Sequence, residues 1–218
     1  MNIELLKKSM LFKDMSEQEI KDSLSYLDAK EKSFKKGTKI LRAGSRTSCM
    51  GMVIQGSVTI ESNDIWGNRT ILSHVGKGQF FAETYSVLAN ETLLIDVVAN
   101  EDTEILFLNS CNITKISVHS NTLQTKLLLN LLAISSHKNL ALSGRSFHIS
   151  LKTIRGRVMS YLNSMAIQKG SSEFDIPFDR QQLADYLNLD RSALSKELGK
   201  MQDDGILKVK KNHFNILS

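Results

Sequence analysis

Hydrophobic residues recur at two different spacings in two parts of the chain. Between residues 34 and 108, apolar and β-branched residues alternate with polar ones in short runs that glycine or Asn/Asp turns separate. The runs cover residues 38–41, 51–54, 57–61, 70–75, 92–98 and 103–108. A period of two is typical of strands, and many short strands at regular intervals favour a closed antiparallel sheet. The pattern therefore predicts an N-terminal β-roll of the jelly-roll class, preceded by a helix that Ser16 and Glu19 cap.

Apolar residues return at helical spacing between residues 121 and 142. Leu127, Leu131 and Ile134 recur four and three residues apart, the spacing of a coiled-coil seam. Leu128 and Leu132 form a second apolar stripe beside them, so one stripe can lie on the β-roll while the other faces a second helix. We assign Leu127, Leu131 and Ile134 to a dimer interface. A single helix that buries a wide face on its own domain fits the periodicity equally well.

A run of small residues at 143–146 predicts a domain boundary, and we expect a hinge over residues 143–150. Beyond it, Ser150 can cap a helix that Gly170 ends. An extended piece with the only proline, Pro177, follows, then two short helices and a hairpin that turns at residues 210–212. Three helices and a β-hairpin in this order predict a winged helix-turn-helix.

The two short helices carry the clearest functional signal in the sequence. Asp179 with Gln182 can cap the first, and Asp190 can cap the second. In the second helix, the apolar residues at positions 194, 198 and 201 must face the core, so its polar residues face outward. Cationic and hydroxyl side chains on such a face suit base edges in the DNA major groove, and cations around it suit phosphates. The candidate DNA-binding residues are Arg180, Arg191, Ser192, Ser195, Lys196, Lys200, Lys210 and Lys211, with Lys208 also on the wing.

Charge and composition sharpen this picture modestly. The net charge is +5, and residues 151–218 hold 11 Lys/Arg against 8 Asp/Glu, whereas residues 1–150 hold 17 against 15. The excess leans toward the candidate DNA-binding region. The two cysteines, Cys49 and Cys111, form no C-x-x-C pair, which disfavours a disulfide framework or thiolate metal site. Charged residues near the N-terminus interrupt any signal-peptide core and no run spans a bilayer, so we expect a cytoplasmic, soluble protein.

With these motifs in place, the chain resembles the Crp/Fnr family of transcription regulators. The matching segments are FKKGTKILRAG (34–44), MVIQGSVTI (52–60), GNRTILSHVGKGQFFAE (67–83) and DRQQLADYLNLDRSALSKEL (179–198). The resemblance implies an α+β fold with a cyclic-nucleotide-binding-like β-roll, a long dimerisation helix and a winged helix. It also implies that Arg191 and Lys196 contact bases and that Arg180 contacts the DNA backbone. Ser192 stands where the family commonly has glutamate, so the operator sequence cannot be borrowed from other members.

The effector region departs further from the cyclic AMP binders. The resemblance places an effector pocket beside Glu83, Thr84, Leu93 and Leu94, but residues 90–98 contain no arginine to meet a cyclic phosphate. We therefore expect a small-molecule effector other than cyclic AMP, and no cofactor or metal. A haem- or redox-responsive regulator, with His74 or Cys49 as a ligand, is one alternative. A cupin-like metal enzyme is another, although the five histidines are dispersed.

These observations give one hypothesis for the whole chain. Residues 1–120 form a sensor β-roll with its N-terminal helix, residues 121–145 a dimerisation helix and hinge, and residues 146–218 a winged helix. We predict a homodimer, without enzyme activity or catalytic residues, that binds a palindromic operator in double-stranded DNA. The resemblance implies RNA polymerase as a further partner and gives no reason to expect a membrane.

Overall fold

The computed structural model describes residues 3–63, 69–88, 90–114 and 122–217. The chain divides into two compact units, Met1–His137 and Lys138–Ser218. The predicted turn at residues 64–68, with Gly67, and the predicted helix start at residue 121 lie outside the described residues. No helix in the described ranges has the length and apolar character needed to cross a bilayer.

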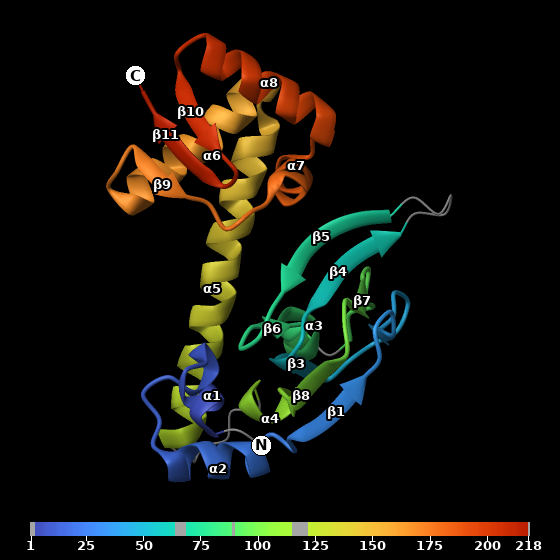
Figure 1. Cartoon of the computed structure of the whole chain (residues 1–218). Helices are drawn as coiled ribbons and strands as arrows, with labels where there is room; N and C mark the ends of the chain where they lie inside the picture. Colours follow the sequence, from blue (N-terminus) through green and yellow to red (C-terminus); the bar gives the residue numbers. More distant parts are fainter. Residues whose placement is uncertain (1–2, 64–68, 89, 115–121, 218) are drawn as a thin grey trace. The chain divides into compact units, whose positions relative to one another are not determined.

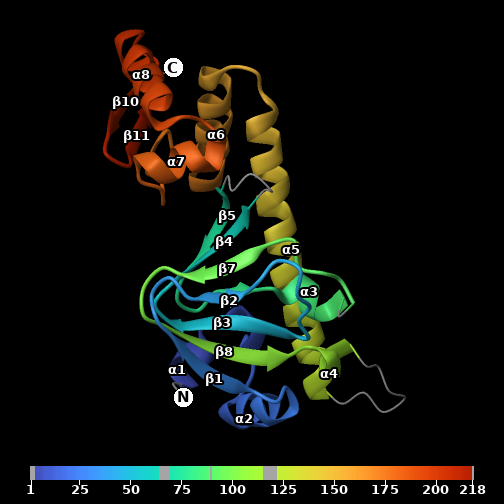
Figure 2. The ribbon, with the colours of Figure 1, turned by 90° about the vertical axis from the view of Figure 1, so that its right-hand side faces the viewer.

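The N-terminal unit is a β-roll of two four-stranded sheets, ordered β1-β8-β3-β6 and β2-β7-β4-β5, with antiparallel pairing throughout. Figure 2 shows β1, β8 and β3 side by side below β7 and β4. The elements are α1 (Ile3–Lys7), a 3₁₀ helix (Met10–Phe12), α2 (Glu17–Tyr26), β1 (Lys30–Phe34), β2 (Lys39–Leu41), β3 (Cys49–Gln55), β4 (Val58–Asn63), β5 (Arg69–Val75), β6 (Phe80–Phe81), α3 (Glu83–Leu88), β7 (Asp96–Ala99), β8 (Thr103–Asn109) and α4 (Cys111–Thr114). The predicted β-roll is therefore confirmed.

The strands that the sequence pattern missed are β1 and β6. All of β1 is exposed or half-buried, so its KEKSF sequence gives no period-two apolar signal. β6 is a buried pair of phenylalanines that is too short to show a period. A Cβ atom on Gly51 would lie 2.1 Å from the Phe81 ring, so β3 accepts β6 at this distance because residue 51 is glycine.

The capping box of α2 is present as the sequence predicts. The Glu19 amide donates to Ser16 Oγ at 3.2 Å, and the Ser16 amide donates to a Glu19 carboxylate oxygen at 2.8 Å. Lys126 also donates to Glu19, and these hydrogen bonds hold the pKa of Glu19 at about 2. Because Lys126 lies on α5 (Thr122–Ser150), this contact ties the long helix to α2.

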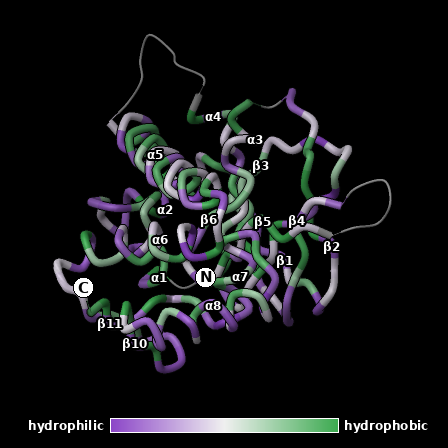
Figure 3. Tube along the Cα trace, turned by 90° about the horizontal axis from the view of Figure 1, so that it is seen from above, coloured by the Kyte–Doolittle hydropathy of each residue, from purple (hydrophilic) through white to green (hydrophobic). Residues whose placement is uncertain are grey.

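The three residues assigned to a dimer interface lie in the subunit's own core. Leu127, Leu131 and Ile134 are at most 4% exposed and belong to the cluster that includes Leu11 and Phe12. That assignment is wrong, because these side chains already pack against the first helices and the β-roll. The neighbouring stripe is the exposed one, with Leu132 at 61%. Hydrophobic positions along α5 are visible in Figure 3.

The C-terminal unit is a winged helix-turn-helix built on one hydrophobic core. It contains the end of α5, α6 (Ile154–Lys169), β9 (Glu173–Asp175), α7 (Arg180–Leu187), α8 (Arg191–Asp203), β10 (Leu207–Lys210) and β11 (His213–Ile216). The three strands form one sheet in the order β10-β11-β9. Leu207 pairs with Ile216 and Lys210 with His213, which leaves Lys211 and Asn212 as the turn of the wing.

The predicted hinge at residues 143–150 is wrong, because α5 remains helical through Gly144 to Ser150. A mid-helix glycine costs about 1 kcal/mol relative to alanine. Contacts of Arg145 with α7 and of His148 with α6, within the same unit, offset that cost. Ser150 does not cap α6 either, since its hydroxyl donates to the Phe147 carbonyl while Thr153 is the N-cap. The non-helical connection is therefore the short segment 151–153.

Candidate nucleic-acid interface

Two capped helices and a tight turn form the centre of the candidate interface. Asp179 Oδ1 accepts from the Gln182 amide at 2.8 Å, and the Gln182 side chain accepts from the Asp179 amide at 2.8 Å. α7 ends at Asn188, whose φ of 52° lies in the left-handed region that asparagine tolerates. Asp190 then caps α8 by accepting from the Ala193 amide at 2.9 Å. The caps predicted from the sequence are confirmed, and they fix where each helix begins.

The helix α8 has one buried and one exposed face. Its buried residues pack into the core of the unit with residues of α6 and α7. They are Leu194, Leu198 and Met201, all at most 2% exposed. Arg191, Ser192, Ser195 and Lys196 are exposed on the other face, with Lys200 one turn further on. The spacing of the apolar residues thus determines which polar groups face solvent.

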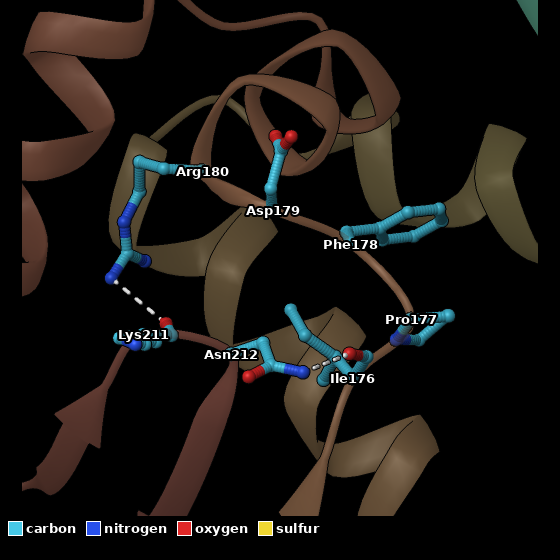
Figure 4. Close-up of a pocket in the computed structure, with 7 residues that line it drawn as sticks. All are labelled: Ile176, Pro177, Phe178, Asp179, Arg180, Lys211 and Asn212. Atoms are coloured by element: carbon cyan, nitrogen blue, oxygen red, sulfur yellow. Dashed lines mark hydrogen bonds between the residues drawn. The ribbon is translucent and has the colours of Figure 1, made fainter.

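The wing is joined to the start of α7 (Figure 4). Arg180 donates to the Lys211 carbonyl at 3.3 Å, and its guanidinium lies 5.9 Å from the centre of the Phe214 ring. Asn212 donates to the Ile176 carbonyl at 3.2 Å from the other side of the turn. Partial burial lowers the pKa of Arg180 from its ordinary value. The residues that make these contacts line a pocket of about 490 Å³ between the wing turn and the start of α7. Arg180 therefore orients the wing as well as carrying charge.

The charged residues of the C-terminal unit include acidic residues that are paired and, among the residues that the structure describes, exposed cations that are not. The acidic residues Glu197 and Asp204 pair with Arg155 at 2.7 Å, and Glu173 and Asp175 contact His213 at 3.0 Å. In contrast, a group of exposed cations makes no ion pair within the described residues. These are Arg191, Lys196, Lys200, Lys208, Lys210 and Lys211. Their charges remain available to neutralise phosphates.

Two arginines to which the sequence gave no role secure the helix-turn-helix. Arg145 donates to the carbonyls of Asp185 and Tyr186 at 3.0 and 2.9 Å, and its guanidinium lies 5.6 Å from the centre of the Tyr186 ring. Arg157 donates to the carbonyls of Leu187 and Asn188 at 3.3 and 3.0 Å. Together they satisfy the carbonyl end of α7 and favour its dipole. Nothing in the local sequence distinguishes them from surface cations.

A buried histidine completes this junction. His148 is 5% exposed, and its Nδ1 lies 2.9 Å from Ser160 Oγ. Its ring packs edge to face against the Tyr161 ring, with the ring centres 5.8 Å apart. Burial lowers the pKa of His148 and raises that of Tyr161. The last turns of α5 are therefore packed into the C-terminal unit.

The residues assigned to an effector pocket are only partly brought together. Glu83 is 5% exposed at the start of α3, and Leu93 is 1% exposed among the side chains that fill the β-roll. Leu94 is 73% exposed and Thr84 is also exposed. The two leucines therefore differ in burial, and the assignment of all four residues to one effector pocket stays a prediction.

The ligand residues proposed for the alternatives have ordinary structural contacts. His74 Nδ1 lies 3.0 Å from Thr59 Oγ1, and that hydroxyl donates to Asn100 at 2.7 Å. Cys49 lies on β3 opposite Asn109. Across the described ranges, no group of three or more His, Cys, Asp or Glu residues is arranged to hold a metal ion.

Comparison with known proteins places this architecture in a class. The cyclic nucleotide-binding domain model matches residues 31–117, and the Crp-like helix-turn-helix domain model matches residues 156–218. Together with the β-roll, α5 and the winged helix, these matches define the fold of a DNA-binding transcription regulator. The chain belongs to the Crp/Fnr family of transcription regulators.

Solved structures share the fold at low sequence identity. The catabolite activator protein of Thermus thermophilus is 23% identical over 95% of this chain and 93% of its own, with a TM-score of 0.51. FixK2 of Bradyrhizobium japonicum is 19% identical over 87% and 93%, with a TM-score of 0.58. The regulator CLP of Xanthomonas campestris, described as responsive to c-di-GMP, is 17% identical over 93% and 100%, with a TM-score of 0.62. A search of curated proteins found no match.

Proposed function

We propose that this protein is a homodimeric, sequence-specific regulator that places α8 of each subunit in one major groove of a palindromic operator. The observation that carries the proposal is the exposed face of α8, where Arg191 and Lys196 have no ion-pair partner among the described residues. Arginine and lysine can donate to guanine O6 and N7. The unpaired wing lysines and Arg180 supply backbone contacts. Two-fold symmetry then sets half-sites about 34 Å apart.

The dimer is proposed to form along the exposed stripe of α5. Leu128, Leu129 and Leu132 are 37%, 59% and 61% exposed beside the buried stripe, and Leu140 is 70% exposed further along the helix. Leu129, Leu132 and Leu140 lie three and eight residues apart, so they fall on one side of the helix, which a second copy of the helix can cover. Large exposed leucines in one row are a typical interaction surface. This interface replaces the one we assigned from the sequence.

Control by a small molecule in the β-roll, other than cyclic AMP, is part of the proposal. Residues 90–98 offer no arginine for a cyclic phosphate, and Leu93 already fills part of the roll interior. Glu83 is buried at the start of α3, where the family resemblance places an effector contact. RNA polymerase is the proposed protein partner through which such a regulator changes transcription.

DNA binding is tested by selecting duplexes from a random pool with the purified full chain. The proposal predicts enrichment of a palindrome, and it predicts that Arg191→Ala and Lys196→Ala each weaken binding to that palindrome by about 10- to 100-fold. Lys169→Ala is the matched control, because Lys169 is an exposed cation in the last turn of α6 and is not among the candidate DNA-binding residues. Equal binding by all three variants and the wild type would overturn the assignment of α8.

The dimer interface is tested by sedimentation at micromolar concentration. Leu132→Asp should yield monomers, because it buries a charge in an apolar seam. Leu94→Asp is the control, since Leu94 is a similarly exposed leucine on the β-roll. Persistence of the dimer in Leu132→Asp would place the interface elsewhere.

A further inference from the structure

The N-terminal turn of α8 contains a serine whose hydroxyl proton is already engaged in a hydrogen bond. Ser192 Oγ lies 2.5 Å from Asp190 Oδ1, and the same oxygen accepts from the Ala193 amide at 2.9 Å. An ionised carboxylate has no proton to give, so the hydroxyl must be the donor. The hydrogen bond from Ser192, followed by that from Ala193, lowers the pKa of Asp190 and keeps the carboxylate ionised near neutral pH.

This hydrogen bond determines what Ser192 offers to a partner. Its side chain is exposed on the face that also carries Arg191 and Lys196. Since the proton points back to Asp190, the oxygen presents only lone pairs outward. The negative carboxylate behind the hydroxyl polarises it further in the same sense. Ser192 therefore acts as a hydrogen-bond acceptor toward solvent.

Ser195 provides a contrast on the same helix face. It is also exposed, but its hydroxyl makes no hydrogen bond to another side chain within the described part of the chain. That hydroxyl can rotate and either donate or accept. Two serines three residues apart on one helix therefore differ in hydrogen-bonding character, and only Ser192, which is hydrogen-bonded to the N-cap residue, has a fixed role.

We propose that Ser192 is a specificity-determining residue that selects, on the DNA strand it faces, a base with an amino group at its major-groove edge, namely cytosine (N4) or adenine (N6). The inference rests on the proposed DNA binding by α8 and adds the chemistry of one contact. Guanine and thymine present acceptors at the same place, and these would meet the lone pairs of Ser192 without a proton between them. We expect a preference of about tenfold for amino-bearing bases at one position in each half-site.

The experiment is a selection from random duplexes with the full-length wild type and four variants. Ser192→Ala should lose the preference for cytosine or adenine at one position per half-site while preferences elsewhere persist, and Ser192→Thr should retain it because it keeps the hydroxyl. Asp190→Ser keeps an N-cap residue but removes the carboxylate, so the same preference should fall although Ser192 is intact. Ser195→Ala is the matched control and should leave that position unchanged.

Three results would overturn the inference. One is a Ser192→Ala variant that selects the same bases as the wild type, and another is a wild-type preference at that position for guanine or thymine, because the hydroxyl would then be a donor. The third is an Asp190→Ser variant with unchanged selectivity. A wild type that enriches no sequence at all would instead overturn the proposed function, so the two failures are distinguishable.

Discussion

Replacing Arg145 with methionine tests whether the end of α5 is part of the DNA-binding unit. Methionine keeps a long apolar side chain but removes the hydrogen bonds to the carbonyls of Asp185 and Tyr186 and the cation above the Tyr186 ring. Hydrogen bonds from a charged donor contribute about 1.5 kcal/mol each at the low end of their range, and an exposed cation–π contact contributes about 0.5 to 1 kcal/mol. These terms sum to about 3.5 to 4 kcal/mol, and because Arg145 is only half-buried, solvent screening can remove up to about half of this sum. We therefore expect the free energy of unfolding of the C-terminal unit to fall by about 2 to 4 kcal/mol.

Hydrogen exchange followed by mass spectrometry localises this effect. Peptides covering α7 and α8 should exchange about 30-fold faster or more in Arg145→Met, since 1.4 kcal/mol corresponds to a factor of ten. Lys152→Met is the matched control, because Lys152 is an exposed cation in the connection between α5 and α6. If α7 is as well protected in both variants as in the wild type, the Arg145 contacts do not stabilise the C-terminal unit, which would favour the predicted hinge over a helix held by these contacts.

Two further predictions concern pH and one concerns salt. Burial lowers the pKa of His148, so as pH falls the unfolded chain binds a proton at this residue before the folded chain does. The stability of the C-terminal unit should therefore decrease as pH falls below about 6.5. Urea titrations at several pH values should show this decrease in the wild type but not in His148→Phe. The hydrogen bonds that His213 donates to Glu173 and Asp175 raise the pKa of His213. His213→Gln should therefore remove a contribution to stability that is present at low pH and declines as pH rises, which the same titrations measure. The double variant Lys210→Ala, Lys211→Ala should weaken binding to all DNA sequences alike. The slope of log K against log salt concentration should become less steep by about 0.9 for each phosphate that the wing no longer neutralises. An unchanged slope would show that the wing does not contact the DNA backbone.

The sequence predicted those parts of the fold that depend on local signals. The caps at Asp179 and Asp190 and the exposed face of α8 could be predicted, because short-range hydrogen bonds and a helical apolar period determine them. Gly37, Gly44, Gly56 and Gly78 all have φ between 80° and 84°, as expected of glycines that make turns. These features need no knowledge of distant residues.

The predictions from sequence were wrong where contacts between residues far apart in the sequence determine the structure. Periodicity identified two apolar stripes on α5, but which stripe packs on its own subunit depends on Leu11 and Phe12, far away in sequence. The run at 143–146 would break an isolated helix, yet Arg145 and His148 hold it in the helical form through α6 and α7. The donation from Ser192 to Asp190 is local, but its consequence becomes clear only when the helix face is known to be exposed.

The central claim is that α8 meets base edges in the major groove, and a methylation-interference experiment tests it most directly. Guanines of the selected operator are methylated at N7, and the methylated positions that block binding are mapped for the wild type and for Arg191→Ala. We predict symmetrically placed guanines that block the wild type in both half-sites, and one of these positions in each half-site should no longer affect Arg191→Ala. An Arg191→Ala variant that remains sensitive to methylation at every one of those guanines would contradict the claim.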